Sequence, residues 1–176
     1  MARYIAKLVD HAVGLTAAQS HFVEVAAGKL FDQAFEGTSD GVDVSWGTGN
    51  SNDNLVVHFV MDREHSFLKV KWPQANIDVA AGGHTYVQAA GPISGTEIYR
   101  QRGGANLPHH SYPISIFHEA LHNLFPGWSI DQMHMLDGGG DAAGMAAAHY
   151  NVNTPMTEHN KQLMRQGFSV KNAQYF

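Results

Sequence analysis

One short run, His118-Glu119-Ala120-Leu121-His122, constrains this 176-residue sequence more than any other feature. On a helix, residues four apart lie on one face a turn apart, so the imidazoles of His118 and His122 can reach one metal ion. The pattern favours zinc, which accepts neutral imidazole nitrogens and keeps a fourth position for water when three side chains bind it. Glu119 would flank that ion and can take a proton from the water.

The surrounding residues predict the helix that this chemistry requires. Pro113 suits a first helical turn, Ser111 or Tyr112 can cap it, and Pro126-Gly127 ends it. The apolar residues recur at intervals of three and four and should face the core: Ile114, Phe117, Leu121 and Leu124. With 12 histidines in the chain, chance produces about 0.03 such motifs. An accidental match is therefore disfavoured.

Composition narrows the class of protein. The apolar content of 44% fits one globular domain, and the net charge of −5 without a basic run argues against nucleic acid as a partner. Without cysteine, the strong metal ligands are His, Asp and Glu. No apolar run is long enough for a membrane span, and residues 1–7 lack the features of a signal peptide. We therefore expect no membrane association and a cytoplasmic protein or one exported without a signal; the compartment stays open.

Periodicity predicts an α+β element order. A capping box at Thr16 to Gln19 starts an amphipathic helix that ends near Gly37, with Phe22, Val25, Ala26, Leu30 and Ala34 expected on its core face. Thr154, Pro155 and Gly167 outline a last helix. Strands are predicted at residues 3–9, 42–46, 55–61, 67–72, 84–89 and 96–101.

The motif and this order resemble the zincin metallopeptidases, and more narrowly the metzincins. The resemblance implies a single domain over residues 1–176. Its upper subdomain, about 1–127, would hold a twisted mixed sheet and two long helices, one of them carrying the motif. Its lower subdomain, about 128–176, would be irregular and end in a helix. A methionine turn beneath the metal is implied as well, for which Met145 is the candidate and Met156 the competitor; Tyr150 could offer a hydroxyl nearby.

The third metal ligand departs from the metzincin pattern, which has a glycine three residues after the second histidine and a histidine three residues later. Here glycine first appears at Gly127 and histidine at His134. We predict His134 as the third ligand, because zinc without thiolates favours imidazole. Asp131 is the next candidate, or an acceptor that orients a ligand histidine. Less favoured are Asp137, Asp141, His149 and Glu158, while His109 and His110 are expected to be exposed.

These features predict a zinc-dependent endopeptidase that holds one catalytic zinc ion through His118, His122 and His134. It would hydrolyse peptide bonds of a peptide or protein substrate by a metal-activated water, with Glu119 as general base. An edge strand beside the cleft would hold the extended substrate, and residues 96–101 are the expected strand. The alternatives are a non-catalytic zinc-binding domain that acts in binding or regulation, and a structural protein with an accidental motif.

Overall fold

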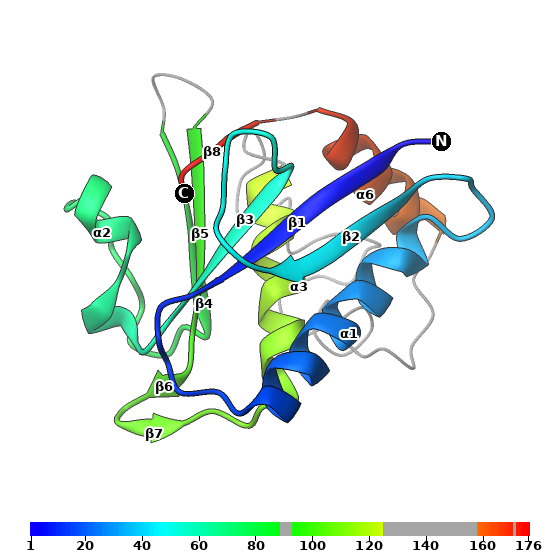
Figure 1. Cartoon of the computed structure of the whole chain (residues 1–176). Helices are drawn as coiled ribbons and strands as arrows, with labels where there is room; N and C mark the ends of the chain where they lie inside the picture. The colour runs from blue at the N-terminus through cyan, green and yellow to red at the C-terminus, as the bar shows by residue number, and fades with distance from the viewer. Residues whose placement is uncertain (89–92, 125–157, 171) are drawn as a thin grey trace.

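The computed structural model describes residues 1–88, 93–124, 158–170 and 172–176 and shows a mixed α+β architecture (Figure 1). The long helices α1 (Ala17–Ala34) and α3 (Ser111–Leu124) lie together on one face of a central sheet. Helix α6 (Glu158–Ser169) packs against both of them. The short helices η1 (Arg63–His65) and α2 (Leu68–Lys71) lie away from this layer. No helix in the described part of the chain is both long and apolar enough to cross a membrane.

The sheet is mainly parallel, with the strand order β2-β1-β3-β5-β4. Strands β1, β2, β3 and β5 run parallel, β4 pairs antiparallel with β5, and the short β8 also pairs parallel with β5. A two-stranded hairpin, β6 and β7, leads toward α3. The strand bounds are β1 Arg3–Asp10, β2 Gly41–Trp46, β3 Leu55–Val60, β4 Gly83–Val87, β5 Ile93–Tyr99, β6 Gln101–Arg102, β7 Ala105–Asn106 and β8 Ala173–Gln174.

The predicted substrate strand, residues 96–101, is not an edge strand. Its residues Thr96 to Tyr99 belong to β5, which pairs with β3 on one side and with β4 on the other. Among the described residues, β4 pairs with β5 alone and therefore forms this edge of the sheet. The strand that precedes the motif helix in sequence was predicted to be the edge strand. This prediction was wrong, because the position of a strand in a sheet depends on pairing between segments that are distant in sequence.

Helix α1 confirms the predicted capping box. The Thr16 hydroxyl accepts from the Gln19 amide at 3.1 Å, and the Gln19 side chain accepts from the Thr16 amide at 3.0 Å. The predicted core face was partly wrong, since Phe22 and Val25 are each 39% exposed. The face that is buried instead combines two stripes of residues four apart: Val23, Ala27 and Phe31 with Ala26, Leu30 and Ala34.

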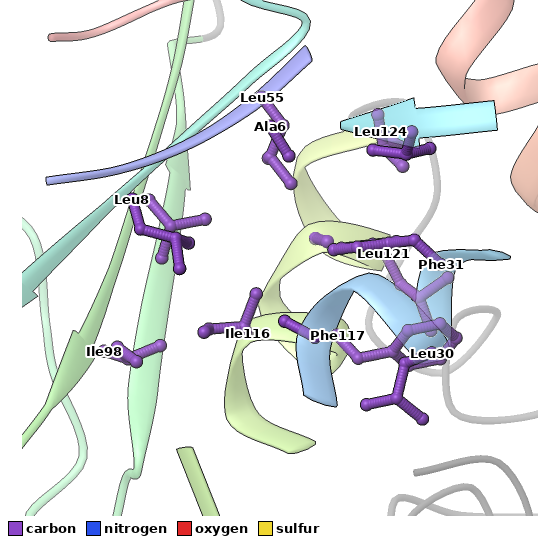
Figure 2. Packing of buried hydrophobic residues seen from close by; sticks show 14 of the residues in the cluster. Ala6, Leu8, Leu30, Phe31, Leu55, Ile98, Ile116, Phe117, Leu121 and Leu124 are labelled. Carbon is purple, nitrogen blue, oxygen red and sulfur yellow. The ribbon is translucent and has the colours of Figure 1, made fainter. Parts of the chain in front are cut away.

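The main core lies between the sheet and the two long helices. Figure 2 shows Leu8 and Ile98 of the sheet facing Ile116 of α3, while Phe117 and Leu121 turn toward Leu30 and Phe31 of α1. Burying each large apolar side chain of this kind contributes about 1.5–3 kcal/mol. The motif helix is thus fixed on two sides, as its predicted apolar stripe requires.

Residues 67–72, predicted as a strand, instead contain the short helix α2 (Leu68–Lys71) with Phe67 and Trp72 as its caps. The buried carboxylate of Glu97 on β5 accepts from the Ser66 hydroxyl at 2.6 Å and from the Leu68 amide at 2.8 Å, which pins the segment in a turn. Leu68 and Trp72 are then buried four residues apart, and the Trp72 amide donates to the Leu68 carbonyl at 2.8 Å.

The last predicted helix is α6. It continues through Gly167 to Ser169 and does not end at the glycine.

The C-terminal segment is tied to the sheet by a pair of histidines. His58 on β3 is 1% exposed, and its Nε2 lies 2.9 Å from the Tyr175 carbonyl oxygen. Nε2 must therefore carry the proton and donate. The Nδ1 of His58 accepts from the Nε2 of His11 at 2.9 Å. Burial lowers the pKa of His58 to about 4, so the ring is neutral in the folded protein at neutral pH.

Folding stability should consequently fall in mild acid. The unfolded chain binds a proton at His58 near pH 6.5, whereas the folded chain resists it down to about pH 4. The stabilisation is complete above pH 6.5 and is lost as the pH falls toward 4, by up to about 3 kcal/mol. Urea unfolding of wild type and His58→Gln between pH 4 and 8 would show a flatter pH dependence in the variant. Equal slopes in the two proteins would contradict this assignment.

Candidate metal centre

The two motif histidines lie side by side on α3. Their Nε2 atoms are 3.2 Å apart and their ring centroids 4.8 Å apart. Two imidazole nitrogens bound at about 2.0–2.1 Å to one tetrahedral zinc ion would themselves be about 3.3 Å apart. The observed separation fits that requirement, and in a metal-free chain it equally fits an N–H···N hydrogen bond. His118 and His122 therefore form two vertices of a possible zinc site.

Glu119 is buried between α3 and β4, at 7% exposure. Its Oε2 accepts from the Thr85 hydroxyl of β4 at 2.8 Å, and its backbone carbonyl lies 3.0 Å from the same hydroxyl. Its Oε1 lies 3.9 Å from the Nε2 of His118. The carboxylate thus has one oxygen on β4 and the other on the side of the histidines.

Close packing explains why this carboxylate can lie against the strand. A Cβ atom at Gly83 would come within 2.8 Å of the Glu119 Cγ atom and within 2.8 Å of the Glu97 carbonyl oxygen. The glycine therefore leaves the space that the glutamate side chain fills. Burial is the main cause that raises the pKa of Glu119 to about 7; the Thr85 hydrogen bond opposes this shift, and the nearby charge of Glu97 adds to it. A carboxyl group with such a pKa can gain and lose a proton near neutral pH.

A buried polar cluster anchors the C-terminal turn of α3. The Asn123 Nδ2 donates to the Thr96 hydroxyl at 2.8 Å and to the Gln174 Oε1 at 2.9 Å. The Gln174 Nε2 donates back to the Asn123 Oδ1 at 2.9 Å, and the Asn172 side chain donates to the Asn123 carbonyl at 3.2 Å. Because Asn123 directly follows His122, these bonds fix the backbone that carries the second histidine.

Sequence reasoning did not identify Thr85, Thr96, Asn123 or Gln174. The signal that was available is Asn123 itself, a polar residue among the apolar positions of the motif helix. Buried amides need partners, so such a residue predicts a buried hydrogen-bonding network. The sequence alone does not say which distant segments supply the partners.

The structure brings together His118, Glu119 and His122, as the motif predicts. His109 and His110 are exposed, as expected. Glu158, one of the less favoured third ligands, pairs with Arg165 at 2.9 Å at the start of α6. The other predicted positions lie outside the described residues: Asp131, His134, Asp137, Asp141, Met145, His149, Tyr150 and Met156.

Residues 1–88, 93–124, 158–170 and 172–176 contain no group of three side chains placed to hold one metal ion. Within these ranges the candidate centre consists of two adjacent histidines and one nearby carboxylate. Comparison with known proteins found no family model and no curated protein that matches the sequence.

Proposed function

We propose that the protein is a zinc-dependent endopeptidase of the zincin type, similar to the metzincins. The observation that carries the proposal is the pair of Nε2 atoms 3.2 Å apart with the buried Glu119 carboxylate beside them. The mixed sheet backed by two long helices, one carrying the motif, supports the metzincin resemblance. His134 is proposed as the third ligand, with Asp131 as the next candidate.

Each part of the centre has a chemical role in this proposal. Zinc, when bound, supplies a Lewis acid that polarises the substrate carbonyl and makes water more acidic. Glu119 takes a proton from the attacking water through its Oε1 and then delivers that proton to the leaving amine. In the metal-free protein, burial raises the pKa of this carboxyl group above its ordinary value, which favours acceptance of the proton in the first of these transfers. A purely structural zinc site would have no use for such a base.

The substrate is proposed to be a peptide segment in extended conformation. Strand β4 lies beside the centre, since Thr85 contacts Glu119, and among the described residues it pairs on one side only. Its other side can accept an additional strand through main-chain hydrogen bonds. Strand β4 thereby takes the role that the sequence assigned to residues 96–101.

Cleavage of casein or of a peptide library by the purified protein tests this function. We expect one zinc ion per chain by elemental analysis, activity that a chelator removes, and recovery when zinc is added back. Zinc binding without cleavage of any library peptide would leave the non-catalytic zinc-binding domain as the function. Absence of both zinc and cleavage would overturn the proposal entirely.

A further inference from the structure

We infer that Thr85 is a positioning residue, which holds the Glu119 carboxylate so that one oxygen is bound and the other is free to meet water. This inference rests on the proposed peptidase function. Thr85 lies on β4 and reaches across to α3, where its hydroxyl is 2.8 Å from the Glu119 Oε2. Among the residues that the structure describes, it is the sheet side chain that donates a hydrogen bond to the carboxylate of the proposed general base.

The direction of the hydrogen bonds supports this role. The Asn123 Nδ2 can only donate, so the Thr96 hydroxyl accepts from it at 2.8 Å. The hydrogen of Thr96 is then available to Thr85, whose Oγ1 lies 3.2 Å away. Having accepted that bond, Thr85 directs its own hydrogen toward Glu119, where the carboxylate Oε2 at 2.8 Å is a nearer acceptor than the backbone carbonyl oxygen at 3.0 Å. The donors therefore run in one direction, from Asn123 through Thr96 and Thr85 to the carboxylate.

This chain of donors is buried at Asn123 and Thr96 and partly buried at Thr85. Thr96 and Asn123 are fully buried, and Asn123 is held by reciprocal bonds with Gln174 of β8. Buried hydroxyls and amides keep fixed orientations because a lost partner costs about 1–3 kcal/mol. A fixed donor at Oε2 restrains rotation of the carboxylate. The remaining oxygen, Oε1, then stays on the histidine side, 3.9 Å from the Nε2 of His118.

The substitutions Thr85→Val and Thr85→Ser separate positioning from packing. Valine keeps the shape of threonine but lacks the hydroxyl, so we expect kcat to fall about 10–100-fold with KM and zinc content nearly unchanged. Serine keeps the hydroxyl and should restore most of the rate. Thr38→Val is the matched control, because the Thr38 hydroxyl donates to the Phe35 carbonyl at 2.7 Å on the turn after α1. That variant should keep the wild-type kcat.

A second readout uses the metal-free protein and needs no catalysis. The shift in urea midpoint caused by Thr85→Val should be smaller in a Glu119→Ala background than in wild type, since no carboxylate is then left without its donor. Equal shifts in both backgrounds, or a kcat of Thr85→Val equal to wild type, would overturn the positioning role while the peptidase function stands. A wild-type protein that cleaves no peptide would instead overturn the proposed function, and this inference with it.

Discussion

Glu119→Gln is expected to lose peptide cleavage by at least about 100-fold, because an amide cannot take a proton from the attacking water. The variant should otherwise resemble wild type. Glutamine has the same shape and keeps an oxygen that can accept from Thr85, which lies 2.8 Å from the Glu119 Oε2. It also removes the cost of burying a charged carboxylate, so the free energy of unfolding above pH 7 should be at least that of wild type.

Peptide cleavage, elemental analysis and urea unfolding measure these three properties of the Glu119→Gln variant. Glu64→Gln is a suitable control, since the Glu64 side chain is largely exposed on η1. Among the described residues, its ion-pair partner is Arg63. It should retain full activity and full zinc content. Cleavage by Glu119→Gln at the wild-type rate would remove Glu119 from the role of general base. Loss of zinc in this variant would instead show that the carboxylate supports the metal site itself.

His118→Ala and His122→Ala are each expected to lower zinc affinity by more than about 100-fold, since even groups that only orient a ligand change metal affinity 10–100-fold. The physical reason is geometric. The two Nε2 atoms, 3.2 Å apart, are proposed as two of the zinc ligands, so alanine at either position removes one donor from the proposed site. The proteins should come through purification with almost no zinc and no peptidase activity.

The control for these variants is His110→Ala, because His110 is exposed and contacts the ring of His109. Its zinc content should equal that of wild type. Calorimetric titration of the metal-free proteins with zinc measures the zinc affinities of His118→Ala, His122→Ala and His110→Ala. If His110→Ala lost zinc while His118→Ala kept it, the metal site would lie on the loop before α3 and not on the helix.

Local signals predicted the parts of the fold that depend on neighbours in sequence. The capping box at Thr16 and the helix around His118 were predicted because their determinants lie within a few residues. The segment at Leu68 was wrongly predicted as a strand, because the group that bends it, the Glu97 carboxylate, lies 29 residues away. The predicted position of β5 at the edge of the sheet was wrong for the same reason, because its pairing partners are set by contacts that are not local in sequence.

The candidate site shows the same division. His118, Glu119 and His122 share one helix, so their spacing alone predicts that they meet. The hydroxyl of Thr85 reaches Glu119 from 34 positions away, which no local pattern encodes. The third ligand, predicted as His134, stays a prediction because residue 134 lies outside the described residues.

The side chain of Gln174 has a consequence for the order of folding. It joins segments remote along the chain, since its partners Asn123 and the Val56 amide lie 51 and 118 positions away. Contacts of such long range require closure of large loops, and the entropy lost in that closure delays them relative to helix formation. The turn that carries His122 should therefore become rigid only near the end of folding. Tight metal capture would then mark completion of the tertiary structure rather than an early helical intermediate.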